Sequence, residues 1–284
     1  MVLILLAPAG RAWGRNYALK KYNKNRWTLI QKDYLKKDVD RLIFVKYTGG
    51  SKANIEMWKK VKVTTGVTAS KAAAVEDEEP MPFIEETEAP AAAPAADAPS
   101  VGEETTAAPT TTAAPETTAA VKKTKTTYAW KKILSCSGYV GLNGIKKVKE
   151  GDKKTPTGAF HITMAFGIKK SPGTAGISYT KLNKYYYWSG EEETYNTFVD
   201  VRDLGRTWMA GEHLISYVPF YNYALAMDFN KEGVYKKGSA IFMHCTKPGR
   251  NYTAGCVAIA EKKMKKVVKN TTQKTMIFIY PIGQ

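Results

Sequence analysis

The chain has 284 residues, enough for one large domain or two and for a substantial hydrophobic core. Its formal net charge of +17 favours a polyanionic partner, such as nucleic acid, anionic lipid or the anionic polymers of a cell wall. The lysines are scattered rather than aligned along one helix and no nucleic-acid-binding motif occurs, so nucleic acid is not expected as a partner.

Residues 1–12 are typical of a secretory signal. The first 9 residues are apolar and uncharged and Gly-Arg-Ala follows, as in an h-region and cleavage site whose basic n-region is missing. The alternative is a buried N-terminal strand. No other apolar run approaches the ~18 residues that a membrane helix needs, and no cysteine follows the apolar stretch as a lipoprotein anchor would require. We therefore expect an exported protein without a transmembrane helix.

The segment 13–63 contains a strand–turn–strand pattern. Residues 41–47 form an apolar run, a glycine turn follows, and residues 53–60 form a second run. A segment with two strands is too small to fold comfortably alone. We therefore expect these strands to belong to the sheet that the rest of the chain builds.

Residues 64–121 are of low complexity, built from Ala, Thr, Pro and Glu, with 11 acidic side chains and 1 basic one. Such a composition cannot bury enough apolar area to offset chain entropy, so we expect disorder. The usual interpretation is a linker between two domains. We favour an insertion extruded from a hairpin, because a strand pattern resumes at 128–134 and loop closure costs only the logarithm of loop length.

Residues 122–284 predict mainly β-structure. Turn signals rich in glycine and proline recur, and short apolar runs lie between them, at 160–166, 217–223, 240–243 and 276–280. Helical spacing is seen around Met264, Val267 and Val268. We predict a β-sandwich or a partly closed barrel of mixed sheet, with one or two short helices.

One stretch near the C-terminus carries a candidate nucleophile and its base. His244 closes an apolar run, and the turn Thr253-Ala254-Gly255-Cys256 precedes a second one. A thiol is a poor nucleophile until a histidine activates it. The glycine lets the backbone bend so that its amides point at a substrate carbonyl. The pattern therefore predicts Cys256 as nucleophile and His244 as base.

Less specific interpretations compete with this one. The pair could be a core histidine and an inert small hydrophobe. A zinc site is weaker still, because no Cys-x-x-Cys pair occurs and the 3 histidines are widely spaced, so no metal or cofactor is expected. Cys136 and Cys245 could pair in an exported protein, but we expect two small buried hydrophobes.

Two blocks of sequence occur in an order shared with a known enzyme family. The first runs through residues 138–144 and 149–160 and contains Asp-Lys-Lys-Thr-Pro-Thr-Gly. The second comprises residues 238–244 and 253–259 and contains the histidine and the Gly-Cys pair. In this the chain resembles the YkuD-type L,D-transpeptidases, cysteine enzymes of bacterial peptidoglycan, over about residues 128–284.

The chain departs from the family's common signature. Ala254 stands where a second histidine is usual, and Ala258 where arginine or asparagine is usual. The spacing from His244 to Cys256 is also shorter than in the best-known members. The chain thus resembles a divergent subgroup with a Thr-Ala-Gly-Cys motif. Arg250 could replace the missing group that orients the stem peptide, although a solvated loop charge is the simpler interpretation.

The resemblance implies acyl transfer from a stem tetrapeptide. Cys256 would attack the carbonyl of the third stem residue and expel D-alanine, and an amine of a neighbouring stem would then take the acyl group, forming a 3→3 cross-link. His244 would act as base and then as acid. Backbone amides of Gly255 and Cys256, with Ala254, would form the oxyanion hole. The carbonyl of Cys245 would orient His244.

Two alternatives remain open. Water as acceptor would make the same site an L,D-carboxypeptidase, and a decayed site would leave a non-catalytic wall-binding protein. Thr253, His213 and Tyr223 are further candidates for substrate binding, with a structural role favoured for His213 and sheet packing as the alternative for Tyr223. Peptidoglycan stem peptides are the expected partners, with an anionic wall polymer compatible with the charge, and no oligomeric state is indicated.

Overall fold

The computed structural model describes residues 26–64 and 126–283. The signal segment predicted at residues 1–12 lies outside the described residues. So does the low-complexity segment after Thr64, with its predicted disorder.

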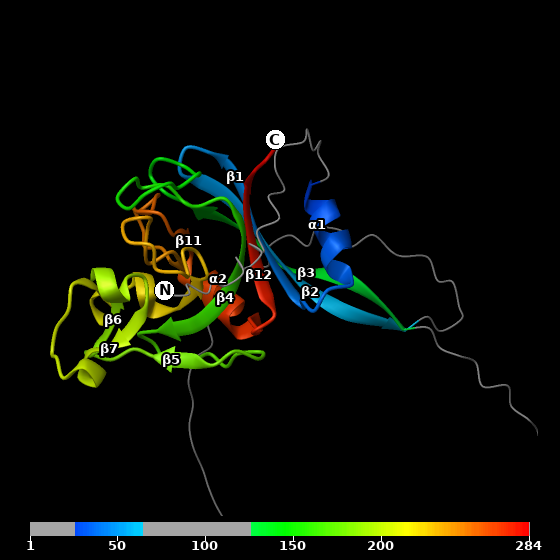
Figure 1. The fold of residues 1–284 in the computed structure, drawn as a ribbon. Helices are drawn as coiled ribbons and strands as arrows, with labels where there is room; N and C mark the ends of the chain where they lie inside the picture. The colour runs from blue at the N-terminus through cyan, green and yellow to red at the C-terminus, as the bar shows by residue number, and fades with distance from the viewer. Residues whose placement is uncertain (1–25, 65–125, 284) are drawn as a thin grey trace, which may run out of the picture. The chain divides into compact units, whose positions relative to one another are not determined.

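The described strands form one large mixed sheet that closes into a barrel of 8 strands (Figure 1). Their order is β12-β1-β2-β3-β11-β10-β9-β4; β4 also pairs with β12, which closes the ring, and with β5 at its end. The predicted mainly β fold is confirmed, with the barrel closed. The strands are β1 Arg41–Gly49, β2 Lys52–Thr64, β3 Thr126–Tyr139, β4 Gly158–Gly167, β5 Tyr179–Lys181, β9 Ala224–Met227, β10 Phe242–Cys245, β11 Val257–Ile259 and β12 Thr275–Pro281.

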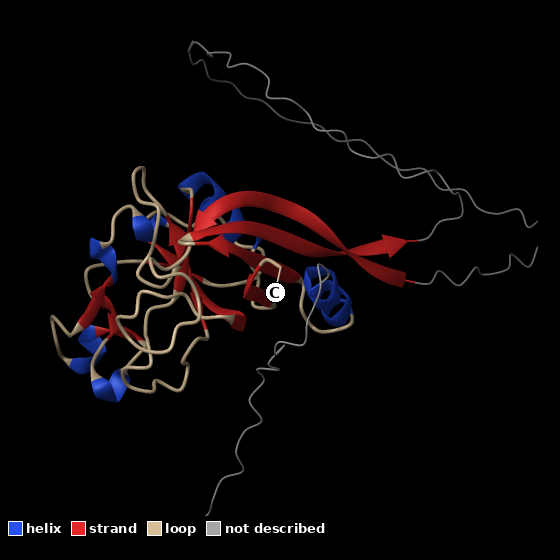
Figure 2. Ribbon diagram, turned by 90° about the horizontal axis from the view of Figure 1, so that it is seen from above, coloured by secondary structure: helices blue, strands red, loops and turns tan. Residues whose placement is uncertain are grey.

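The strands β1 and β2 lie in the same sheet as the C-terminal strands. β1 pairs in parallel with β12, from Arg41 opposite Thr275, and antiparallel with β2. β2 neighbours β3, and Thr127 Oγ1 donates a hydrogen bond to the Val63 carbonyl at 3.3 Å. Figure 2 shows this long pair of strands extending away from the other strands. The residues between Thr64 and Thr126 therefore connect neighbouring ends of two adjacent strands.

The described residues contain two α-helices, α1 Arg26–Leu35 and α2 Glu261–Asn270. The sequence predicted α2, whose Met264, Val267 and Val268 are buried. It did not predict α1, where Arg26, Ile30 and Tyr34 are buried four residues apart on one helix face. Neither helix combines the length and the apolar composition that crossing a membrane requires.

A second, smaller sheet lies between β5 and β9 in the sequence. Its order is β7-β6-β8, with β6 Tyr186–Ser189, β7 Phe198–Asp200 and β8 Gly211–His213, and short 3-10 helices at Glu192–Thr194, Val201–Leu204, Leu214–Ser216 and Phe220–Asn222. The strand-like interpretation of 217–223 was wrong. Pro219 lacks the N–H that a strand would pair, so the chain turns there and β9 begins only at Ala224.

The sheet buries its two faces differently. Along β10, Met243 and Cys245 belong to the cluster that fills the barrel, while Phe242 faces outward because side chains alternate along a strand. One outer surface, which we call the α1 face, carries Phe44 and Phe278 under α1. The other, which we call the β10 face, is covered by the chain between β5 and β9; its buried residues are Phe166, Leu182, Trp188, Leu214, Tyr221, Ala224, Ala226, Ala240, Phe242 and Cys256.

Candidate active site

Cys256 lies on the β10 face, immediately before β11. Its side chain is buried, with 8% exposed, beside Phe242 of the neighbouring strand. The Phe242 amide donates to Sγ at 3.4 Å, and the thiol donates to the Ala240 carbonyl at 3.2 Å. Burial, helped by the negative charge of Glu212, raises the pKa of the Cys256 thiol to about 12. The resting group is therefore a neutral thiol.

His244 lies two residues after Phe242 and, by strand alternation, on the same outward side. Its Nδ1 is 2.7 Å from the carbonyl oxygen of Cys245, the group that we expected to orient it. A carbonyl oxygen only accepts, so Nδ1 carries the proton and Nε2 keeps its lone pair. Burial lowers the pKa of His244 to about 4, although the Cys245 hydrogen bond opposes the shift. The imidazole is thus neutral, with Nε2 free to take a proton.

The turn before the thiol is fixed by the Thr253 hydroxyl. Thr253 Oγ1 accepts from the Gly255 amide at 3.1 Å and donates to the Cys256 carbonyl at 2.7 Å. Gly255 has φ +151°, a conformation that favours glycine. Because the Gly255 amide is bonded to Thr253, it is not free for a substrate oxygen. Within the described residues the amides of Ala254 and Cys256 have no such partner.

The two sequence blocks meet at this turn. Thr155, fully buried, donates its hydroxyl to the Cys256 carbonyl at 3.1 Å and accepts from the Gly141 amide at 2.8 Å. The Thr253 amide donates to the Val140 carbonyl at 2.9 Å. The Thr-Pro-Thr-Gly block therefore supports the backbone of Cys256, a role that its spacing in the sequence could not reveal.

A buried ion pair lies close to the same turn. Lys147 Nζ is 3.0 Å from Asp152, with 2% and 7% of the two side chains exposed. Burial raises the pKa of Asp152, but hydrogen bonds from the amides of Val148 and Lys154 and from Lys147 outweigh it, and the pKa falls to about 2. Lys147 Nζ lies 3.7 Å from the position that a Cβ at Gly255 would take. Its charge lowers the pKa of the nearby thiol and opposes the effect of burial.

A carboxylate also faces this site. Glu212 in β8 lies opposite Trp188 and accepts a 2.5 Å hydrogen bond from the Tyr221 hydroxyl. The Tyr221 ring lies 5.5 Å from the His244 ring and 5.5 Å from that of Phe242. Burial raises the pKa of Glu212 to about 7, against the Tyr221 hydrogen bond. Sequence reasoning missed this residue, although it adjoins His213.

Two predicted substrate contacts lie elsewhere. His213 stacks on Tyr187 at 4.5 Å, and its Nε2 and Nδ1 bond the Lys184 carbonyl and the Ser216 hydroxyl. Tyr223 belongs to the cluster inside the barrel. The structure does not bring either side chain to Cys256. Across residues 26–64 and 126–283, no three His, Cys, Asp or Glu side chains gather closely enough to hold a metal ion.

The side chains of the other two cysteines do not lie on the β10 face with Cys256. Cys136 and Cys245 are free thiols, as is Cys256. Cys245 is buried inside the barrel with its sulfur 3.5 Å from the Tyr223 carbonyl, and burial raises its pKa to about 12. Cys136 is half-buried in β3, and burial raises its pKa as well.

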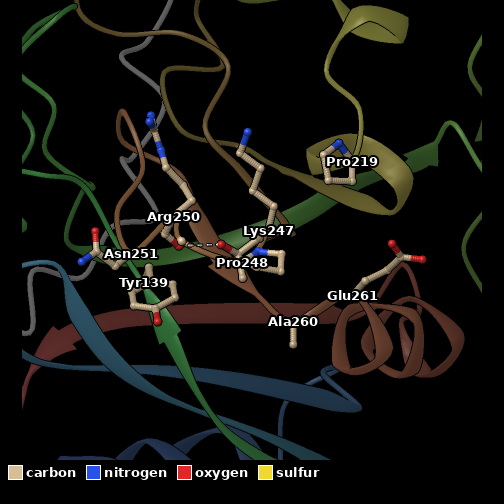
Figure 3. Close-up of a pocket in the computed structure, with 10 residues that line it drawn as sticks. Tyr139, Pro219, Lys247, Pro248, Arg250, Asn251, Ala260 and Glu261 are labelled. Carbon is tan, nitrogen blue, oxygen red and sulfur yellow. Dashed lines mark hydrogen bonds between the residues drawn. The ribbon is translucent and has the colours of Figure 1, made fainter.

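A cavity of about 640 Å³ lies at the loop between β10 and β11 (Figure 3). Arg250 and Lys247 extend in the same direction from this loop. Arg250 stacks on Tyr252 at 3.9 Å, and Lys247 lies 5.5 Å from the Phe220 ring, which contacts His244. Cys256 is not among the lining residues. The lining residues are Tyr139, Pro219, Thr246, Lys247, Pro248, Gly249, Arg250, Asn251, Ala260 and Glu261.

Comparison with known proteins gives one family. The model of the YkuD family, described as the L,D-transpeptidase catalytic domain, matches residues 112–279, more than half of the chain. The matched range contains both sequence blocks and every residue placed around Cys256. It leaves out β1 and β2, which nevertheless occupy two positions in the same sheet. No curated protein matches the chain.

Proposed function

This chain belongs to the YkuD family of cysteine-dependent L,D-transpeptidase catalytic domains, which act on peptidoglycan, and from that premise we propose that it cross-links stem peptides through a thioester on Cys256. One observation carries the proposal. The Cys245 carbonyl holds the proton of His244 on Nδ1, so Nε2 is the base on the face that carries Cys256. A neutral thiol and a neutral imidazole form the resting pair, with proton transfer occurring as the sulfur attacks.

The first step acylates the enzyme. The Cys256 sulfur bonds to the carbonyl carbon of the third stem residue while the thiol proton moves to His244 Nε2. The carbonyl oxygen gains negative charge, which the free amides of Cys256 and Ala254 stabilise, in place of the Gly255 amide that Thr253 engages. The C–N bond then breaks, and His244 returns the proton to the departing D-alanine amine.

The second step decides between the two enzymatic alternatives. An amine of a neighbouring stem that attacks the thioester gives a 3→3 cross-link, and water gives a tripeptide. We favour the amine because Cys256 is 8% exposed and lies among the aromatic side chains of the β10 face, where few waters fit. A wall-binding protein without catalysis would have no need of the His244 tautomer.

We propose that the cavity at the loop between β10 and β11 binds the donor stem. Lys247 and Arg250 supply positive charge for stem carboxylates, and neither forms an ion pair within the described residues. Replacing Arg250 with Ala should raise the donor KM about tenfold with kcat little changed. The matched control is Arg206→Ala, which removes an exposed arginine that pairs with Glu191. Equal KM values for the two variants would remove Arg250 from the binding site.

The proposed substrate also implies a location. Peptidoglycan lies outside the cytoplasmic membrane, so we propose that the protein is exported by the segment at residues 1–12 and works at the wall. The net charge of +17 would hold it near anionic wall polymers. Fractionation of cells that express the full chain tests this, and retention in the cytoplasm would contradict it.

Product analysis tests the reaction. The purified chain is incubated with disaccharide-tetrapeptide, and dimers, tripeptides and D-alanine are quantified by mass spectrometry. Dimers with released D-alanine are expected; tripeptides alone would indicate a carboxypeptidase. No product would exclude both activities. Cys256→Ser should form no product, whereas Cys136→Ser, which changes a thiol of β3, should be as active as the unchanged chain.

A further inference from the structure

Glu212 is an unexpected neighbour for a cysteine nucleophile. Its negative charge raises the pKa of Cys256 and so disfavours the thiolate that attacks a donor. Among the described residues none of the ion pairs includes Glu212, and its carboxylate is bonded by a neutral hydroxyl, that of Tyr221. The negative charge of Glu212 hinders acylation of Cys256, and no cation neutralises it within the described residues. We therefore looked for a role of this carboxylate in the second step, the attack on the thioester.

The geometry connects Glu212 to the reacting groups. Tyr221 bridges them, because its hydroxyl bonds the carboxylate at 2.5 Å while its ring edge contacts the His244 imidazole at 5.5 Å. Tyr217 stacks on Tyr221 at 4.9 Å and is 36% exposed, so this side of the site reaches the surface. Burial and, after it, the negative charge of Glu212 raise the pKa of Tyr217. The Glu212 carboxylate therefore lies close to a side chain that is partly exposed at the surface, that of Tyr217.

We propose that Glu212 binds the side-chain ammonium group of the acceptor stem and removes one proton from it before the amine attacks the thioester. The proposal rests on the proposed function, since it concerns the second step of the same reaction. The acceptor stem would then bind on the Glu212 side of His244. The donor stem would bind in the cavity that Lys247 and Arg250 line. The charges at the two places thus match a cationic amine and anionic carboxylates.

The step balances. The acceptor ammonium gives one proton to the Glu212 carboxylate and becomes an amine. The amine nitrogen bonds to the thioester carbon, the C–S bond breaks with its electron pair on sulfur, and a second proton passes through His244 Nε2 to give the Cys256 thiol. The third hydrogen stays on the new amide nitrogen. The Glu212 carboxyl then returns its proton to solvent.

The negative charge of Glu212 does not hinder the second step. In the acyl-enzyme Cys256 is a neutral thioester, so the repulsion that raises its pKa in the free enzyme is absent. The remaining titratable groups that face the carboxylate are Tyr221, Tyr217 and Glu150, and the charge of Glu150 also favours an incoming cation. Glu212 then draws an ammonium group into the site ahead of water, which favours cross-linking over hydrolysis.

The test compares the two steps in the full chain. Intact-protein mass spectrometry measures acyl-enzyme formed from disaccharide-tetrapeptide, and chromatography measures dimers and tripeptides. Glu212→Gln should lower the dimer rate about 100-fold and raise the tripeptide share, with acylation at least as fast as before. Glu212→Asp, which keeps the charge, should recover part of the dimer rate. Asp200→Asn makes the same chemical change on β7 of the small sheet and should alter neither.

Several outcomes would overturn the proposal. An unchanged ratio of dimers to tripeptides in an acylated Glu212→Gln enzyme would exclude Glu212 from the second step. Equal loss of acylation and of dimers in the folded variant would assign it to the first step or to the fold. Absence of acylation in the unchanged chain would instead contradict the proposed function, acyl transfer through a thioester on Cys256.

A second measurement needs no variant. An acceptor stem whose side-chain amine is trimethylated keeps its positive charge but cannot attack. It should inhibit dimer formation in the unchanged chain without slowing acylation. The acetylated acceptor, which has no charge, should not inhibit. Equal inhibition by the two analogues would show that charge is not recognised and would contradict the proposal.

Discussion

The α1 face and the β10 face are built alike and differ in their charged groups. On the α1 face Phe44 packs at 5.1 Å from Trp27 and 5.7 Å from Phe278. On the β10 face Phe242 packs at 4.7 Å from Trp188 and 5.5 Å from Tyr221. Aromatic contacts, tilted at Trp27 and edge-to-face at Trp188 and Tyr221, therefore hold the segments that cover the barrel on both sides.

The charges on the two faces are arranged differently. On the α1 face cations lie over rings, as Arg26 does over Tyr280 at 4.9 Å and Lys46 over Trp27 at 5.3 Å. The β10 face buries the Cys256 thiol and the His244 imidazole and half-buries the Glu212 side chain, and none of the three is in an ion pair within the described residues. Aromatic packing alone thus does not mark a site. The β10 face differs in carrying a thiol, an imidazole and a carboxylate together, and each prediction below tests a difference between the two faces.

The largest expected effect is on turnover at the β10 face. Cys256→Ser should lower the rate of dimer formation at least about 1,000-fold, because a serine hydroxyl is a far weaker nucleophile beside a neutral imidazole. His244→Gln should lower it about 100-fold or more through loss of the base. Thermal unfolding should show both variants folded. A Cys256→Ser enzyme that keeps its activity would contradict the assignment.

The next effect compares the two faces directly. Phe44→Ala and Phe242→Ala each remove a fully buried ring and should lower the free energy of unfolding by about 3–5 kcal/mol. Only Phe242→Ala should also slow acylation in the folded fraction, because the Phe242 ring packs in the same cluster as Cys256 and its loss frees the thiol to move. Urea unfolding and acylation rates measure the two quantities. Equal acylation rates would remove the distinction between the faces.

A smaller loss of stability is expected from the ion pair. Asp152→Asn leaves the Lys147 ammonium, 2% exposed, without its counter-charge and should cost about 3 kcal/mol. Lys37→Met removes a cation that lies 3.9 Å from the centre of the Tyr34 ring on the α1 face and should cost about 1 kcal/mol. Urea unfolding of the two variants gives both values. The Asp152→Asn variant should lose more unfolding free energy than the variant on the α1 face. The opposite order would show that the buried ion pair does not stabilise the turn as expected.

The pH dependence of stability tests His244. Its pKa of about 4 in the folded chain lies below the ordinary value of 6.5, so the unfolded chain binds more protons between these values. Stability from this group is complete above pH 6.5 and is lost as the pH falls towards 4, by about 2–3 kcal/mol. Unfolding of the unchanged chain should show the decline, and His244→Gln should flatten it. Parallel curves would exclude a buried neutral imidazole.

The sequence predicts well what depends on local patterns. The strand at β12 and the helix α2 follow from apolar periodicity, and the His244 and Gly255-Cys256 motifs follow from residue types and spacing. The helix α1 was missed because its signal, Ile30 and Tyr34 four residues apart, is short.

Long-range contacts explain the other differences. Glu212 faces Cys256 only because β8 pairs with β6 and the small sheet packs on the β10 face. The Gly255 amide is engaged by a side-chain rotamer of Thr253, which no spacing rule encodes. Tyr223 and Tyr221 look equivalent in the sequence, yet one lies inside the barrel and the other on the β10 face.

The most direct measurement maps the acyl group on the chain. After incubation with the tetrapeptide donor and acid quenching, digestion and mass spectrometry locate the adduct among Cys136, Cys245 and Cys256. The Cys245 thiol lies inside the barrel and the Cys136 thiol packs against the same interior cluster, so neither thiol shares the β10 face with the His244 side chain. We predict an adduct on Cys256 alone, lost on hydroxylamine treatment. An adduct on another cysteine, or none with a donor that is turned over, would contradict the account.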